Sequence, residues 1–117
     1  MSKGSKSYHN GIAAEDIAAR QYISQGGKEL ARRWKTKHGE IDLIIRHGSV
    51  IIFVEVKARK THELAAAAIT PKQQQRLLDC ASEYLAKHAD MNADCRFDLA
   101  MVDAQGQCVV LENILAG

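Results

Sequence analysis

The fold of this chain is decided by the stretch Gly39-Glu40-Ile41-Asp42-Leu43-Ile44-Ile45-Arg46 and, three residues later, Val50-Ile51-Ile52-Phe53-Val54-Glu55-Val56-Lys57. Both segments are rich in β-branched and other apolar residues, and His47-Gly48-Ser49 between them is typical of a turn. We therefore predict a hairpin of two strands over 40–46 and 50–57. The second strand is apolar on both faces, which favours a central position in the sheet.

Further elements are predicted on both sides of this hairpin. Apolar residues at helical spacing indicate a helix over 11–25 with Asn10 as its N-cap, and a weaker signal indicates a strand over 28–35. Thr70-Pro71 begins a helix that runs to about His88, with Gln73 completing a capping box. Segment 58–68 is expected to be a loop or an irregular helix start, and 95–102 and 108–112 are predicted strands. The order α-β-β-β-α-β-β predicts one α/β domain over residues 1–117, with 1–9 expected to be flexible.

The composition fits an ordinary globular domain but hides an uneven distribution of charge. The 117 residues are 46% hydrophobic and 26% charged, which excludes a disordered chain and a membrane protein. The net charge of +2 combines a basic segment 28–60, with nine basic and four acidic residues, and an acidic segment 79–117, with two and seven. The basic segment is a candidate phosphate-contacting face, and a solvated surface without a partner is the alternative.

Cysteine spacing and the N-terminal sequence indicate a cytoplasmic protein. The three cysteines Cys80, Cys95 and Cys108 form no CxxC pair, so we expect reduced thiols in place of a disulfide scaffold or a zinc ribbon. The first ten residues are polar and basic without the apolar core of a signal peptide. No apolar run approaches the length of a membrane span.

A group of charged residues lies in the predicted hairpin. Residues two apart in a strand share a face, so Glu55 and Lys57 project to one side. In the preceding strand the same rule places Glu40, Asp42, Ile44 and Arg46 on one face and Ile41, Leu43 and Ile45 on the other. With a short turn between the strands, Asp42 can lie close to Glu55. Two carboxylates and a lysine would then converge near one end of the hairpin.

This convergence favours metal-dependent chemistry on a phosphodiester. Buried charges are costly unless they are paired or bind a metal, and a hard divalent cation relieves the repulsion between two carboxylates. Oxygen ligands with remaining waters suit Mg²⁺, or Mn²⁺ in its place. A lysine such as Lys57 can orient or deprotonate a water, or stabilise charge on a phosphate. The alternative is a salt-bridged surface pair, which is common on exposed strands.

The two motifs resemble the conserved centre of the YraN-like bacterial proteins, a family predicted to be endonuclease-like. The resemblance covers most of the chain. Gly11 and Glu15 fit the first-helix pattern, 70–77 is similar to the second-helix start, and Arg96-Phe97-Asp98 fits the late strand. That family in turn resembles the restriction-endonuclease-like, PD-(D/E)XK, superfamily, which includes Holliday junction resolvases. The resemblance therefore implies a mixed central β-sheet flanked by helices.

The resemblance also implies roles for individual residues. Asp42 and Glu55 are the expected metal ligands, Lys57 is the expected catalytic lysine, and Glu15 matches the first-helix glutamate that completes such sites. Glu40 and Gln74 are expected to support the site. One departure is Ile41 before Asp42, where the superfamily pattern has proline, and this change leaves the carboxylate in place.

Six basic residues flank the predicted site in sequence and are candidate contacts to nucleic acid: Arg32, Arg33, Lys35, Lys37, Arg59 and Lys60. Trp34 lies among them and either stacks on a splayed base or packs against the sheet, the commoner role for such a residue. Arg96 and Asp98 are expected to form a structural ion pair.

Three functions are consistent with these observations. The leading hypothesis is a Mg²⁺-dependent endonuclease acting on DNA, favoured over RNA, with branched or structured DNA as the expected form. The second is a non-catalytic nucleic-acid-binding accessory module on the same fold. The third is a structural domain whose charged hairpin is an ion-pair network. A homodimer is expected by analogy with junction resolvases, and no membrane partner is expected.

Overall fold

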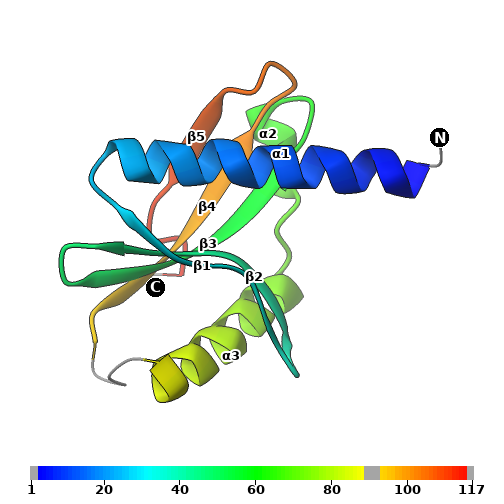
Figure 1. Ribbon diagram of the computed structural model, residues 1–117. Coiled ribbons are helices and arrows are strands. Elements are labelled where there is room, and N and C mark those ends of the chain that lie inside the picture. Colours follow the sequence, from blue (N-terminus) through cyan, green and yellow to red (C-terminus); the bar gives the residue numbers. More distant parts are fainter. Residues whose placement is uncertain (1–2, 89–92, 116–117) are drawn as a thin grey trace.

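The computed structural model describes residues 3–88 and 93–115, which form a five-stranded sheet with helices on both faces (Figure 1). In chain order the elements are α1 (Lys3–Ser24), β1 (Lys28–Thr36), β2 (Gly39–His47), β3 (Val50–Ala58), α2 (His62–Ala67), α3 (Pro71–His88), β4 (Cys95–Val102) and β5 (Cys108–Leu111). The predicted α/β class and order are confirmed. The short helix α2 lies within the segment that was predicted to be a loop or an irregular helix start.

The sheet is open and mixed, with the strands in the order β1-β2-β3-β4-β5. Neighbouring strands are antiparallel except β3 and β4, which are parallel and are joined by a crossover through α2 and α3. The β2–β3 hairpin is confirmed, with His47 opposite Val50 next to the turn and Leu43 opposite Val54. Because β3 and β4 are parallel neighbours, their carboxyl ends lie side by side at one end of the sheet.

The core has a layer on each face of the sheet. Ile51, Ile52, Phe53 and Val54 are all buried, so β3 is central, as predicted. Helix α1 covers the face that carries Leu43, Ile45, Ile52 and Val54, and α3 covers the face that carries Ile41, Ile44, Ile51 and Phe53. Helix α2 covers Leu99 and Met101 of β4 through Ala65. Within the described ranges, no helix is long and apolar enough to cross a membrane.

Strand β2 changes face between Ile41 and Leu43, which corrects the regular alternation predicted for it. Ile41 packs with Ile44 under α3, whereas the predicted pattern placed it with Leu43. The pairing with β1 passes from Arg32–Leu43 to Trp34–Ile41, and Arg33 between them has a φ of 53°. This left-handed residue interrupts the pleat of β1 beside the point at which the strict period of two fails in β2, at Asp42.

The start of α3 agrees with the prediction, whereas the start of α1 does not. The capping box of α3 is confirmed, because Gln73 N–H donates to Thr70 Oγ1 and Thr70 N–H donates to Gln73 Oε1, both at 3.1 Å. Helix α1 begins at Lys3, so the prediction of Asn10 as its N-cap is wrong. No proline lies in this segment, and a glycine inside a helix costs only about 1 kcal/mol. The expected flexibility of 1–9 stays a prediction, and residues 1–2 lie outside the described part.

Candidate active site

The candidate site begins where β2 separates from β3. The backbone pairing of the hairpin extends from the turn back to Leu43 and Val54. Asp42 immediately precedes Leu43 and is the first residue of β2 beyond this pairing. The Asp42 carboxylate accepts a hydrogen bond from the backbone N–H of Val56 at 2.8 Å. A side-chain oxygen therefore takes the place of a backbone carbonyl at this point, and it fixes the Asp42 carboxylate beside Glu55.

Glu55 and Lys57 form an ion pair on the next strand. They share one side of β3, and Lys57 Nζ lies 3.4 Å from Glu55 Oε1. Their side chains are only 13% and 17% exposed for Lys57 and Glu55, respectively, unlike an ordinary surface pair. A half-buried ammonium next to a carboxylate is held in place by both packing and charge.

The surroundings of Asp42 raise the pKa of its carboxyl group. Burial, the negative charge of Glu55 and a hydrogen bond between the two carboxyl groups raise the pKa of Asp42 from 3.8 to about 7. The N–H of Val56 and the positive charge of Lys57 act in the opposite direction. Near neutral pH the metal-free pair therefore holds a proton on a fraction of the molecules. A divalent cation would replace that proton and relieve the repulsion.

Glu15 reaches the same region from helix α1. Glu15 is only 7% exposed, and this burial is the main cause that raises the pKa of its carboxyl group. The negative charges of Asp42 and Glu40 also raise this pKa, so Glu15 lies within electrostatic reach of both. Arg33 opposes these effects, because its Nε donates to Glu15 Oε1 at 2.8 Å and its Nη2 to Oε2 at 3.4 Å.

A cavity of about 470 Å³ opens over the carboxylates. Its lining residues come from β1, β2, β3 and α3, and they are Lys35, Thr36, Gly39, Glu40, Asp42, Glu55 and Arg76. The volume falls in the usual range of ligand sites. The acidic floor and the two basic side chains at its border are the arrangement expected for a cation and a phosphate together.

Arg76 is the contribution of α3 to this cavity, and the sequence did not single it out. Gln74, which was expected to support the site, does not line the cavity. The side chain of Arg76 lies against Gly39, where the carbons Cδ and Cγ occupy the space that a Cβ would need. The only signal in the sequence was the position of Arg76 in the polar first turns of the predicted helix.

The donor set fits a hard cation with incomplete protein ligation. Asp42 and Glu55 supply carboxylate oxygens, the ligand type that Mg²⁺ and Mn²⁺ prefer, and Mg²⁺ usually keeps several waters. In the described ranges no group of three or more His, Cys, Asp or Glu side chains is arranged to hold a metal ion. The two predicted ligands therefore stand as a pair, and Glu15 is a further carboxylate within electrostatic reach of Asp42.

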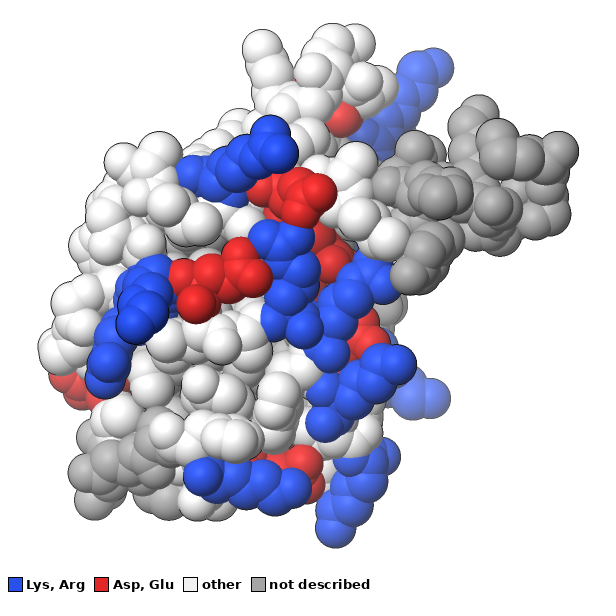
Figure 2. Space-filling view, viewed as in Figure 1, with Lys and Arg blue, Asp and Glu red and all other residues white. Residues whose placement is uncertain are grey.

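The six predicted nucleic-acid contacts fall into separate groups. Arg32 forms ion pairs with Asp16 and Glu29, and Arg33 pairs with Glu15, so both guanidinium groups are engaged within the protein. The exposed side chains are those of Lys35, Lys37, Arg59 and Lys60, of which Lys35 lines the carboxylate cavity. Figure 2 shows Lys and Arg side chains in a band down one face of the molecule, with acidic side chains among them.

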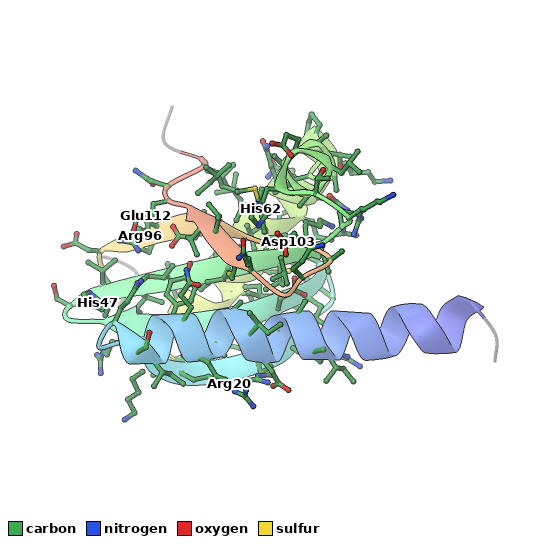
Figure 3. All side chains as sticks on the ribbon, turned by 90° about the horizontal axis from the view of Figure 1, so that it is seen from above. Arg20, His47, His62, Arg96, Asp103 and Glu112 are labelled. Carbon is green, nitrogen blue, oxygen red and sulfur yellow. The ribbon has the colours of Figure 1, made fainter. Side chains whose placement is uncertain are left out.

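A second charged cluster is structural. Asp98 is fully buried and accepts hydrogen bonds from Tyr22 Oη at 2.7 Å, from Arg96 Nε at 3.1 Å and from the Asn113 N–H at 3.0 Å. Arg96 also lies 3.4 Å from Glu112, and Figure 3 shows these two side chains next to each other. The cluster joins α1, β4 and the segment after β5, so the expected structural pair of Arg96 and Asp98 is present.

Trp34 is part of the core on the α3 side. Its ring meets those of Tyr84 and His88 edge-on, with centroids 5.2 and 5.7 Å apart. Of the two roles considered for this residue, packing against the sheet is therefore the one the structure supports.

Comparison with known proteins places these residues in a family. A family model described as "Uncharacterised protein family UPF0102" matches residues 14–102, which include Glu15, Asp42, Glu55 and Lys57. The chain belongs to the UPF0102 family. This is the YraN-like family that the sequence motifs indicated.

Relatives in the UPF0102 family extend over most of the chain. A UPF0102 protein of Cereibacter sphaeroides (strain ATCC 17029) is 44% identical over 115 residues, covering 97% of each chain. One of Roseobacter denitrificans is 41% identical over 114 residues, covering 97% of this chain and 88% of the relative. One of Bradyrhizobium diazoefficiens is 44% identical over 96 residues, or 81% and 72% of the two chains. The similarity therefore includes every element that carries the candidate site.

Proposed function

We propose that this UPF0102 protein is a metal-dependent endonuclease that hydrolyses phosphodiester bonds in DNA. The observation that carries the proposal is the convergence of Asp42 and Glu55 over one cavity, with Lys57 3.4 Å from Glu55. Each of the three groups has a part in phosphodiester hydrolysis, and their burial makes an incidental surface pair a poor explanation.

In this proposal Asp42 and Glu55 hold a Mg²⁺ or Mn²⁺ ion. When bound, the ion supplies positive charge against the phosphate and lowers the pKa of a coordinated water. The two carboxylates orient that ion relative to the substrate phosphate. For hydrolysis, a water oxygen would bond to phosphorus as one P–O ester bond breaks, and the proton lost by the water would pass to the departing oxygen, which gives a phosphomonoester and a hydroxyl group.

Lys57 supplies the fixed positive charge. Its ammonium is held by Glu55 and can stabilise the charge that builds on the phosphate oxygens in the transition state. Glu15 adds a carboxylate that can orient water, and Arg33 keeps Glu15 in position. Arg76 and Lys35 at the border of the cavity provide contacts for the phosphates on either side of the bond that is cut.

Metal-dependent cleavage at excess protein tests this proposal. Duplex, single-stranded, flap and four-way DNA are incubated with the wild type and with Glu55→Gln, in Mg²⁺, Mn²⁺ or EDTA. Glu83→Gln, an equal charge change on α3 at a residue that does not line the cavity, is the matched control. We expect cleavage of at least one DNA that needs metal, survives in the control and falls about a hundredfold or more in Glu55→Gln. No metal-dependent product on any DNA would overturn the proposal.

A non-catalytic nucleic-acid-binding module is the second candidate. Among the described residues, no group of three or more His, Cys, Asp or Glu side chains is arranged to hold a metal ion. Four basic side chains are nevertheless exposed and free to contact DNA: Lys35, Lys37, Arg59 and Lys60. Such a module binds DNA in a salt-dependent way. Its binding would be unchanged in Glu55→Gln, and no cleavage would accompany it. Cleavage that depends on Glu55 excludes this candidate as the whole function.

A further inference from the structure

A second cavity, of about 690 Å³, lies beside α1. Its lining comes from α1, from the end of β3 with the residues that follow it, and from the end of β4 with the turn before β5. Ala13 and Ile17 lie on α1, Arg59 and Lys60 follow β3, and Asp103 and Ala104 follow β4. None of the residues that line the carboxylate cavity lines this one. We call it the carboxyl-end cavity.

The position of this cavity in the sheet is typical of ligand sites. It lies at the carboxyl ends of β3 and β4, the parallel pair, and in open α/β sheets ligands bind outside the carboxyl ends of such strands. The ladder of the pair continues into the cavity wall, because the Arg59 N–H donates to the Val102 carbonyl at 3.0 Å. The wall is therefore built on rigid backbone, and Arg59 follows Lys57 by only two residues.

The cavity combines an apolar lining with two basic residues. Ala14 and Val102 are buried beneath it, Ala13, Ile17 and Ala104 present carbon atoms along its sides, and Arg59 and Lys60 are exposed. In the part of the chain that the structure describes, no carboxylate lies within ion-pair distance of either basic group. Two positive charges beside an apolar surface are suited to a phosphate attached to an apolar group.

Asp103, the acidic residue in the lining, already forms contacts with other residues of the protein through both of its carboxylate oxygens. Its Oδ1 accepts the N–H groups of Gln105 and Gln107 at 3.0 and 2.9 Å, which fixes the turn between β4 and β5. Its Oδ2 lies 3.6 Å from Nε2 of His62, and Figure 3 shows these two side chains together. The Asp103 carboxylate thus holds the turn in place, and the cavity keeps a basic character.

We infer that the carboxyl-end cavity accepts one unpaired nucleotide of the substrate strand, with its base against Ala13, Ile17 and Ala104 and its phosphate against Arg59 and Lys60. The inference rests on the proposed function and names its substrate as DNA with a single-stranded segment. A duplex keeps its bases stacked inside and presents phosphates to a protein surface, so it would leave the apolar lining without a contact. A volume of about 690 Å³ is ample for a single nucleotide.

Binding without metal tests the inference. Fluorescence anisotropy in EDTA compares labelled oligothymidylate, an abasic strand of equal length and a blunt duplex. The variant Ala104→Trp fills the cavity from the turn, and Ala13→Leu fills it from α1. Ala67→Trp, on the exposed side of α2 and outside both cavities, is the matched control. Thermal melting of each variant confirms that it is folded.

We expect the wild type to bind oligothymidylate about tenfold more tightly than the abasic strand, which corresponds to ~1.4 kcal/mol. Ala104→Trp and Ala13→Leu should remove this preference, and Ala67→Trp should keep it. The inference is overturned if the wild type binds the two strands equally, if the preference survives both cavity-filling variants, or if the blunt duplex binds most tightly.

The result is separable from the nuclease proposal. Binding in EDTA needs no cleavage, so a preference for bases that disappears in Ala104→Trp supports the cavity even for a protein that does not cut DNA. Conversely, metal-dependent cleavage by a protein that binds abasic and normal strands equally would uphold the nuclease and overturn the cavity inference.

Discussion

The carboxylate of Asp42 accepts the backbone N–H of Val56 at 2.8 Å, and this single hydrogen bond places Asp42 beside Glu55. The hydrogen bond lies where the backbone pairing of β2 with β3 has ended. The Asp42 carboxylate therefore accepts the Val56 N–H in place of a backbone carbonyl of β2. The hydrogen bond favours the ionised form of Asp42, whereas burial and Glu55 disfavour it. The site therefore holds a carboxylate under electrostatic strain that a cation would relieve.

The first prediction concerns stability and pH in the metal-free protein. The pKa of Asp42 rises from 3.8 to about 7 on folding, so between these values the folded state binds more protons than the unfolded state. The contribution of Asp42 to stability is then greatest at low pH and falls as pH rises to about 7, by at most about 1.4 kcal/mol per pH unit. Urea unfolding in EDTA at several pH values measures it.

The variant Asp42→Asn is the control for that measurement. Its side chain keeps an oxygen that can accept the Val56 N–H but has no charge to titrate. We expect the stability of the wild type relative to Asp42→Asn to fall between about pH 5 and pH 7 and to level off above. A relative stability that rises with pH across this range would contradict the raised pKa.

The second prediction concerns Lys57. Its positive charge lowers the pKa of Asp42, so Lys57→Gln should raise the pH midpoint at which Asp42 titrates. The carboxyl carbon shift of Asp42 in NMR spectra reports this midpoint directly. Lys28→Gln, the same charge change on the exposed start of β1, should leave it within about a tenth or two of a pH unit. Equal shifts in the two variants would mean that Lys57 acts only through net charge.

The third prediction concerns the buried cluster around Asp98. Tyr22→Phe removes the 2.7 Å hydrogen bond to a fully buried carboxylate and should destabilise the protein by about 1–3 kcal/mol. Because the cluster is structural, metal and DNA binding measured well below the melting temperature should be unchanged. A loss of binding without a loss of stability would instead place Tyr22 and Asp98 in a functional site.

The fourth prediction concerns Gly39 at the border of the carboxylate cavity. Gly39 has a φ of 140°, and a Cβ there would collide with the side chain of Arg76. Gly48, in the hairpin turn, has a φ of 61° but open space around it. Gly48→Ala should cost about 1 kcal/mol from backbone strain alone. Gly39→Ala should cost more and should also weaken DNA binding, because Arg76 must move; equal costs in denaturant unfolding and unchanged binding would contradict this role.

The sequence predicted the elements whose signals are local. The turn at 47–49, the Thr70–Gln73 capping box and the apolar run of β3 each depend on residues next to one another, and each is present in the structure. The approach of Asp42 to Glu55 also followed from hairpin geometry. These features need no knowledge of the rest of the fold.

What the sequence did not predict depends on contacts between distant segments. Ile41 packs on the α3 side of the sheet, and Arg33 in the neighbouring strand β1 has a left-handed backbone; a strict alternation of faces anticipates neither. The pairing of Arg33 with Glu15 joins β1 to α1, and Arg76 reaches the cavity only because α3 packs beside Gly39. Both arginines were visible as basic residues, but their partners were set by tertiary packing.

Anomalous X-ray scattering from crystals soaked in Mn²⁺ would show whether Asp42 and Glu55 together hold a divalent cation beside Lys57. We expect a manganese peak within coordination distance, about 2.0–2.3 Å, of an oxygen of each carboxylate in the wild type, and no peak there in Asp42→Asn. A saturating soak that leaves this position without a peak, or that places manganese away from both carboxylates, would contradict this expectation.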